Sequence, residues 1–241
     1  MTDILTVSHL TKEYGRLKAL DHLSFEVKQG ELLGLVGPNG AGKTTLFNLL
    51  TGCSKPDNGI ITLDGNNITG KSPAMRCRLG VGRTYQVPRP FPRLTVYENV
   101  LVAATHGAGL SECEGRSKVH DLLELTGLAH RKGNFPKVLN SLEAKLLELA
   151  RALGTNPRIL LLDEIAAGVT EPELQHVLRI VRKLQETGIT IVWVEHIPRM
   201  MTHGVERLLV LAQGKILADG KPREVMSNPE VARVYLGQQN Q

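Results

Sequence analysis

The residues best suited to chemistry lie in one short segment, GPNGAGKT, at positions 37–44. This segment fits the pattern G-x-x-x-x-G-K-[ST], follows the apolar run LLGLV and leads into the helical pattern TTLFNLLTG. Small residues let backbone N–H groups converge on phosphates, and a helix N-terminus adds partial positive charge. Lys43 would supply a full charge to the phosphates and Thr44 a hydroxyl for Mg²⁺. The segment predicts a nucleotide-binding loop rather than a glycine-rich turn with an incidental lysine.

Two adjacent carboxylates, Asp163 and Glu164, end a second apolar run, ILLLDE. An acid at the carboxyl end of a buried strand lies where α/β sheets bind their ligands. Asp163 suits the Mg²⁺ shell, directly or through water, and Glu164 is placed to polarise an attacking water. The alternative is that these acids cap the next helix, which is less favoured beside a phosphate loop.

Three further residues are candidates because of where they stand. Gln86 ends GVGRTYQ and His196 ends ITIVWVEH, so three predicted strands would converge on one phosphate site. A glutamine can orient both water and metal, and a histidine can bond a γ-phosphate or hold a base in place. Either residue has the alternative of being a satisfied polar group at a strand end. Tyr14 precedes the core strand, and its ring would either stack on adenine or pack under a loop.

The composition limits the class of protein. The chain has 241 residues, of which 41% are hydrophobic and 22% charged, and no apolar run approaches the roughly 18 residues of a membrane span. The segment MTDILTVSHLTKEYG does not resemble a secretory signal, so we expect a cytoplasmic location. Three dispersed cysteines indicate neither a disulfide framework nor a metal site. The net charge of +5 is dispersed, and with one Trp and four Phe we expect no nucleic-acid partner.

The order of the predicted elements indicates an α/β fold in one domain over 1–241. Strand-like alternation opens the chain, and the later apolar runs predict buried strands. After the connector VPRPFPR the pattern becomes helical until about Asn156, and RLLVLAQGKILADG predicts a hairpin that turns at Gln213-Gly214. We therefore predict a mixed-sheet core flanked by helices over 1–88 and 157–241, with N-terminal antiparallel strands and an inserted helical subdomain over 89–156.

The motifs GPNGAGKTT, RTYQ, ELARAL, ILLLDE and VEH, in this order, resemble the ATPase subunit of an ABC transporter over nearly the whole chain. The resemblance implies a P-loop NTPase core, ATP and Mg²⁺ as ligands, and ATP hydrolysis coupled to transport. It implies that Tyr14 stacks on adenine. The implied phosphate loop consists of Gly37, Pro38, Asn39, Gly40, Ala41, Gly42, Lys43, Thr44 and Thr45. The implied catalytic residues are Glu164, His196 and Gln86, and the implied Mg²⁺ ligands are Thr44, Gln86 and Asp163.

One branch of the family is more similar than the others. GVGRTYQ followed by FPRLTVYENV, and VEHIPRMM followed by PEVARVYLG, resemble importers of branched-chain and related amino acids. This implies transmembrane permease subunits, a second ATPase subunit and, indirectly, a periplasmic or extracellular solute-binding protein, with the chain on the cytoplasmic face of the membrane. Two alternatives stay open: export of lipid or lipopolysaccharide, and a nucleotide-binding regulatory or assembly module with little ATPase activity.

One motif departs from the family pattern. Where the family has L-S-G-G-Q, this chain has LNSLE, so Asn140, Ser141, Leu142 and Glu143 form a degenerate signature. Leu142 replaces a glycine where backbone approaches a γ-phosphate closely. Free N–H groups at a helix start hold anions without glycine, and Asn140 or Ser141 suits the N-cap. We predict a weakened but working clamp on the opposite subunit's nucleotide, in a homodimer or a heterodimer.

Two smaller departures follow the paired carboxylates. Ile165 stands where the family usually has proline, and Thr170 stands where its D-loop usually has aspartate. Both favour the regulatory alternative somewhat.

Overall fold

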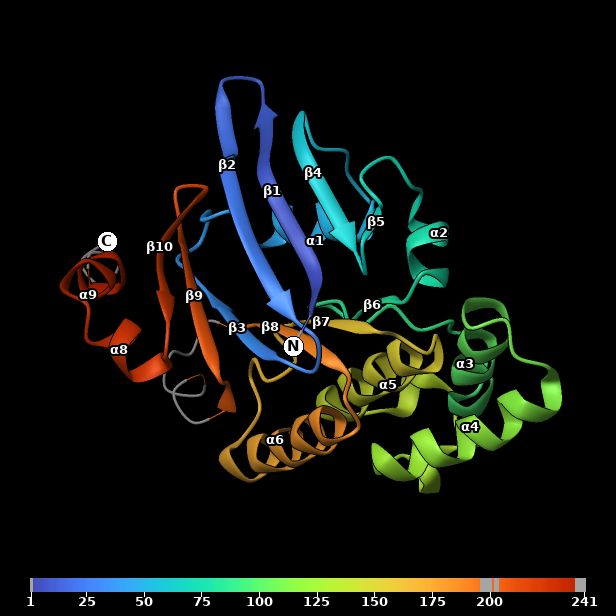
Figure 1. Ribbon diagram of the computed structural model, residues 1–241. Helices are drawn as coiled ribbons and strands as arrows, with labels where there is room; N and C mark the ends of the chain where they lie inside the picture. The colour runs from blue at the N-terminus through green and yellow to red at the C-terminus, as the bar shows by residue number, and fades with distance from the viewer. Residues whose placement is uncertain (1, 196–200, 202–203, 237–241) are drawn as a thin grey trace. The chain divides into compact units, whose positions relative to one another are not determined.

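The computed structural model describes residues 2–195, 201 and 204–236 (Figure 1). The chain divides into two compact units. Met1–Pro73 and Gly188–Gln241 form the first unit, and Ala74–Thr187 form the second. The predicted helical subdomain, 89–156, falls within the second unit, and its boundaries stay a prediction. In the described part of the chain, no helix combines the length and the apolar character that crossing a lipid bilayer requires.

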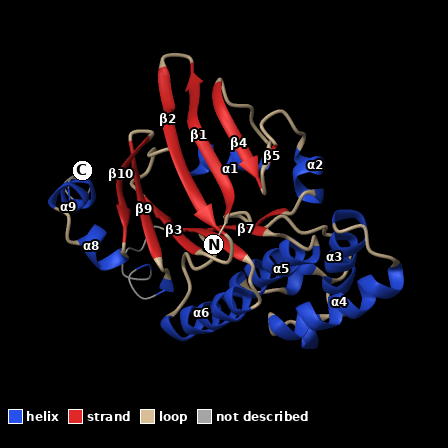
Figure 2. Ribbon diagram, in the orientation of Figure 1, coloured by secondary structure: helices blue, strands red, loops and turns tan. Residues whose placement is uncertain are grey.

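The first unit opens with an antiparallel sheet, which confirms the predicted N-terminal strands. Figure 2 shows its long strands side by side, in the order β2-β1-β4-β5. Alternate side chains in the second half of β2 are buried, those of Leu23, Phe25 and Val27, as expected for a sheet with one face on a core. The strands are β1 (Asp3–Tyr14), β2 (Leu17–Lys28), β4 (Asn58–Leu63) and β5 (Asn66–Asn67).

A second sheet in this unit is mixed, as predicted. β3 pairs in parallel with β8 and with β9, and β10 pairs antiparallel with β9. Every residue of β3 and β8 is buried, which explains why both read as continuous apolar runs. The predicted hairpin turn is confirmed, since Gln213 and Gly214 both have positive φ, 47° and 77°. The strands are β3 (Leu32–Val36), β8 (Thr190–Val194), β9 (Arg207–Ala212) and β10 (Lys215–Gly220).

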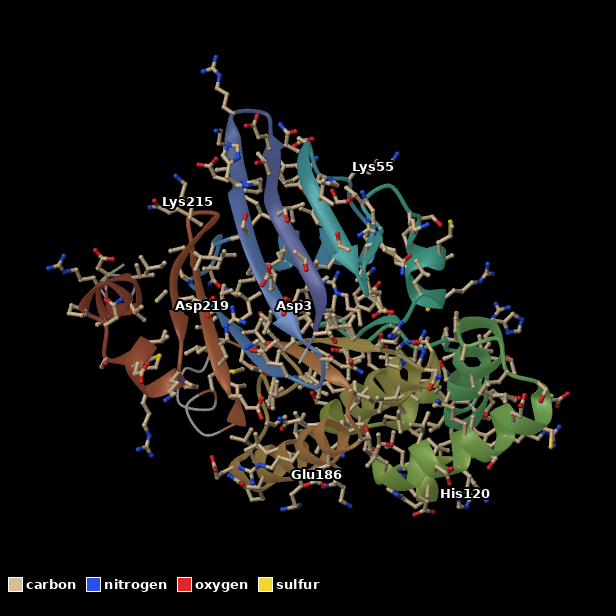
Figure 3. The ribbon with its side chains drawn as sticks, viewed as in Figure 1. Asp3, Lys55, His120, Glu186, Lys215 and Asp219 are labelled. Carbon is tan, nitrogen blue, oxygen red and sulfur yellow. The ribbon has the colours of Figure 1, made fainter. Side chains whose placement is uncertain are left out.

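Ion pairs hold the hairpin of β9 and β10 within the first unit. Arg207 donates from Nε and Nη2 to the two carboxylate oxygens of Asp219, at 2.6 Å each. Lys215 Nζ lies 3.0 Å from Asp21 Oδ2 on β2, and Figure 3 labels both Lys215 and Asp219 on this hairpin. These contacts tie β10 to its neighbour and to β2.

Helices α1, α8 and α9 belong to the first unit. α1 (Lys43–Thr51) begins directly after the phosphate loop and ends at Gly52, whose φ of 77° and N–H bond to the Leu49 carbonyl match the predicted helix end. α8 (Pro222–Met226) and α9 (Pro229–Leu236) are short helices that follow β10.

The second unit is mostly helical around two parallel strands, β6 (Val81–Arg83) and β7 (Ile159–Asp163). In Figure 1, α3, α4, α5 and α6 are drawn below these strands and α2 above them. Thr95, Ser111 and Asn140 begin three of the helices with capping boxes. The helical segments are α2 (Pro73–Arg78), α3 (Val96–Val102), η1 (Ala103–Gly107), α4 (Glu112–Leu125), η2 (Ala129–Arg131), η3 (Pro136–Val138), α5 (Ser141–Gly154) and α6 (Glu171–Glu186).

Candidate functional site

The predicted phosphate loop connects β3 to α1 in the first unit. Gly40 and Gly42 adopt positive φ of 78° and 108°, which residues with a side chain rarely adopt. A Cβ at Gly42 would lie 2.5 Å from the Ala19 carbonyl oxygen, and a Cβ at Gly37 would collide with the Leu211 carbonyl. The loop therefore keeps its path only with glycine at these positions.

Lys43 directs its ammonium group back into this loop. Nζ donates to the carbonyl oxygens of Gly37 at 2.5 Å and Pro38 at 3.0 Å, and the residue is 6% exposed. A cation within a loop at a helix N-terminus makes a strongly positive site that suits the phosphates of a nucleotide. Of the other loop residues, Ala41 is buried, Pro38 and Thr45 are half-buried, and Asn39 and Thr44 are exposed.

Tyr14 is the last residue of β1, at the tip of the hairpin with β2. Its side chain is 50% exposed, and Lys12 Nζ lies 5.4 Å from the ring centroid. The ring is therefore accessible to a ligand. The proposed stacking on adenine stays a prediction.

Asp163 ends β7 in the second unit with its carboxylate held by β6. Arg83 Nη2 donates to Asp163 Oδ2 at 2.8 Å, and the two side chains are only 6% and 7% exposed. The Asp163 N–H also donates to Thr84 Oγ1 at 3.0 Å. Sequence reasoning missed Arg83 as part of the site, although it stands in the quoted motif RTYQ. Removing one partner of a buried ion pair strongly destabilises the folded protein, because the other charge is then buried without a partner.

Glu164 adopts φ of 50°, a left-handed conformation that is uncommon for a residue with a side chain. Its Oε2 accepts a hydrogen bond from Gln86 Nε2 at 2.6 Å, and Glu164 is 7% exposed. The structure therefore brings two of the predicted catalytic residues into direct contact, although 78 positions separate them in the chain. His196, the third, lies outside the described residues.

The degenerate signature forms the first turn of α5. Asn140 Oδ1 accepts from the Glu143 N–H at 2.8 Å, and Glu143 Oε2 accepts from the Asn140 N–H at 3.0 Å. Asn140 is thus the N-cap of α5, and it is one of the two residues that the sequence predicts for this position. Ser141 is exposed and Leu142 is half-buried. Two N–H groups at this helix start already have acceptors within the chain.

Glu143 also has basic neighbours, Arg131 and His130, from the preceding segment. Arg131 Nε donates to Glu143 Oε1 at 2.8 Å, and His130 Nε2 lies 3.5 Å from the same oxygen. Burial raises the pKa of Glu143, but the Asn140 N–H and the Arg131 guanidinium lower it more, so the net pKa lies below its ordinary value. The carboxylate that the sequence places near a phosphate is therefore partly neutralised by its own unit.

The two smaller departures have structural roles. Ile165 is 2% exposed and packs as a core residue directly after Glu164. Thr170 donates its N–H and Oγ1 to the Glu173 carboxylate at 2.7 and 2.8 Å, at the start of α6. Burial accounts for Ile165, and the capping bonds account for Thr170.

Asn99 is a further site-supporting residue that sequence reasoning missed. It is fully buried on α3, and its amide donates to the carbonyl oxygens of Phe91, Leu94 and Thr95 at 2.9 to 3.1 Å. Its Oδ1 accepts the Phe91 N–H at 2.8 Å. These bonds hold the proline-rich connector that follows Gln86. The signal in the sequence is an asparagine at an apolar position of a helical pattern.

The donors that the sequence assigns to Mg²⁺ have suitable chemistry. Thr44 has an exposed hydroxyl at the start of α1 in the first unit, and within the second unit Asp163 has a carboxylate and Gln86 an amide. Mg²⁺ prefers hard oxygen ligands and keeps several waters or phosphate oxygens, so few protein ligands suffice. These residues fit the ion, and their role as ligands stays a prediction.

Comparisons with known proteins agree on the family and differ on the transported substrate. Residues 20–167 match the family model described as ABC transporter, and residues 215–239 match the model described as branched-chain amino acid ATP-binding cassette transporter. The high-affinity branched-chain amino acid transport ATP-binding protein BraF of Pseudomonas aeruginosa is 37% identical over 98% of both chains. The lipopolysaccharide export system ATP-binding protein LptB of Haemophilus influenzae is 36% identical, also over 98% of both. Among solved structures, the ATP-binding cassette MJ1267 in its ADP conformation has a TM-score of 0.88 and 32% identity, covering 98% of this chain and 100% of that one.

Proposed function

This chain belongs to the ABC transporter family as an ATP-binding subunit with ATPase activity, and on that premise we propose that it powers the import of branched-chain or related amino acids. The observation that carries the choice of substrate is the match of residues 215–239 to the branched-chain amino acid model. Overall sequence identity does not discriminate between import and export, since this chain is 37% identical to BraF and 36% identical to LptB. Export of lipopolysaccharide is therefore the second candidate.

We assign ATP binding to the first unit. Lys43 would contact the β- and γ-phosphates, and the glycines of residues 37–45 would let backbone N–H groups approach them closely. The exposed ring of Tyr14 would stack on adenine, with Lys12 near its face. The chemistry that Mg²⁺ supplies when bound is neutralisation of charge on the phosphate oxygens, and Thr44, Gln86 and Asp163 would hold it.

Hydrolysis is assigned to Glu164 as general base. Its carboxylate is buried, and the hydrogen bond from Gln86 fixes its direction before any water is activated. Arg83 does the same for Asp163, so both acids are preorganised by strand β6 and the residues that follow it. We assign to His196 a hydrogen bond with the γ-phosphate of ATP. A module that scarcely hydrolyses ATP has no need of this arrangement, which weighs against the regulatory alternative.

Partners and location follow from the family. Subunits of this type pair with each other and work with membrane-spanning permeases. We propose that this chain binds such permease subunits at the cytoplasmic face of the membrane, together with a second ATPase subunit, and serves a solute-binding protein indirectly. The self-capped start of α5 supports a weak clamp, so a partner with a full signature would leave one strong site in a heterodimer.

The test is ATP turnover by the chain assembled with its membrane subunits in lipid vesicles. A solute-binding protein loaded with leucine, isoleucine or valine should raise turnover severalfold over the unloaded protein, with Glu164→Gln as the inactive control. Stimulation by lipopolysaccharide instead would favour the export alternative. Turnover no higher than that of Glu164→Gln under every condition would favour the regulatory one.

A further inference from the structure

Lys145 is a buried lysine on α5, one turn beyond the degenerate signature. It is 8% exposed and is followed along the helix by the core residues Leu146 and Leu147. Lysine is almost never buried unless its charge and donors are satisfied, because an unpaired ammonium is costly to remove from water. Its position in the core therefore calls for specific contacts.

The ammonium contacts the turn that follows β7. Lys145 Nζ donates to the carbonyl oxygen of Glu164 at 3.4 Å and to that of Ala167. The Glu164 carbonyl also accepts the Ala167 N–H at 3.2 Å, which closes the turn. The Lys145 side chain thus contacts the first and the last residue of the segment 164–167, which begins with the proposed general base.

This turn holds Glu164 in an unusual conformation. A residue with a side chain at φ of 50° persists only where its surroundings fix it. Gln86 holds the far end of the side chain at Oε2, and Lys145 holds the main-chain end at the carbonyl. The two contacts thus restrain Glu164 at its carboxylate and at its main chain.

We propose that Lys145 is a positioning residue, whose ammonium fixes the turn at residues 164–167 on α5 and so sets the direction of the Glu164 carboxylate. The proposal rests on the assignment of Glu164 as general base. Because α5 begins at the signature, Lys145 links the position of that helix start to the catalytic carboxylate of the same chain. A shift of α5 therefore displaces the base.

The first test is ATP turnover by Lys145→Met in the assembled transporter. Methionine preserves much of the side-chain volume and removes the charge and all three donors. We expect kcat to fall about 10- to 100-fold, since a displacement of about 1 Å at a catalytic group has an effect of that size. The KM and the Kd for ATP should stay within about twofold, because Lys43 and the phosphate loop are unchanged. Lys145→Arg keeps the charge and donors and should recover most of kcat.

The matched control is Lys118→Met in the same unit. Lys118 Nζ donates to Asn156 Oδ1 at 2.7 Å and does not contact the turn, so kcat should stay within about twofold of the wild-type value. Thermal unfolding of each variant establishes that it is folded. If Lys145→Met does not fold, Lys145→Gln takes its place, with the same losses expected.

The outcomes separate this proposal from the proposed function. Wild-type turnover by Lys145→Met, with Glu164→Gln inactive, would overturn the role of Lys145 and leave Glu164 as the base. Equal losses in kcat and ATP affinity would also overturn it, because they indicate a general structural role. Wild-type turnover by Glu164→Gln would overturn both assignments.

Discussion

The amide nitrogen of Gln86 lies 2.6 Å from the carboxylate of Glu164, so one side chain after β6 holds the acid that follows β7. The adjacent acid, Asp163, is held in the same way by Arg83 at 2.8 Å. The two carboxylates therefore have different partners and are directed separately. This separation suits one acid to metal binding and the other to proton transfer.

Glu164→Gln should keep ATP binding and nearly abolish turnover, because an amide cannot accept a proton from water. The loss of a general base costs about 10²- to 10⁴-fold in rate. The measurement is phosphate release at saturating MgATP, with Glu124→Gln on the exposed face of α4 as the control. Turnover at the wild-type rate would remove Glu164 from the role of base.

Lys43→Ala should weaken ATP binding, because it removes the ammonium that lies within the phosphate loop. The loss of hydrogen bonds to a charged group, about 1.5–3 kcal/mol, corresponds to roughly a 10- to 100-fold rise in Kd. Equilibrium binding of labelled ATP measures it, with the exposed Lys55→Ala in the same unit as the control. Unchanged affinity would show that Lys43 does not face the phosphates.

The double substitution Asn140→Ser and Leu142→Gly should strengthen ATP-driven dimerisation by about 10- to 100-fold. Glycine restores close backbone approach, and serine keeps an N-cap while it adds a hydroxyl donor. One or two recovered contacts to a charged phosphate outweigh the roughly 1 kcal/mol that glycine costs a helix.

This comparison is made by sedimentation in a Glu164→Gln background, with and without the two substitutions, so that hydrolysis does not reverse the dimer. The single Asn140→Ser variant, which lacks the added glycine, serves as the control. Tight dimers of the native sequence that the substitutions do not improve would contradict the weak clamp. The helix start would then hold phosphate without glycine.

The free energy of unfolding should fall in acid because of the glutamates that bond back to a helix start. Hydrogen bonds from Thr95, Ser111 and Thr170 lower the pKa values of Glu98, Glu114 and Glu173 below the ordinary 4.5. A lowered folded-state pKa means that the stabilisation is complete above about pH 4.5 and is lost as pH falls through the folded-state value.

Urea unfolding at about pH 7 and about pH 3.5 measures this effect. The triple variant Glu98→Gln, Glu114→Gln and Glu173→Gln should be less stable at neutral pH and should lose less stability on acidification. An identical loss in both proteins would assign the acid sensitivity to other carboxylates.

The sequence by itself determined the features whose chemistry is local. The phosphate loop is one contiguous segment, because a strand, a glycine-rich turn and a helix start must follow one another to surround a phosphate. The buried strands, the end of α1 at Gly52, the N-cap of α5 and the turn at Gln213-Gly214 are likewise set by neighbouring residues. Each could be predicted from spacing and residue type alone.

Only the tertiary structure decided which distant side chains meet. The partners Arg83 and Asp163 are 80 positions apart, and Lys145 reaches Glu164 across 19 positions and a change from helix to strand. Which donors reach a buried acid depends on the pairing of β6 with β7 and on the packing of α5, and no local pattern encodes either. The same packing brings Arg131 to Glu143, the carboxylate that caps α5 beside the predicted clamp. The guanidinium partly neutralises the negative charge that would otherwise repel a phosphate there. A charged group that is removed from water is costly unless it is paired, and the fold determines which partner lies close enough to pair with it.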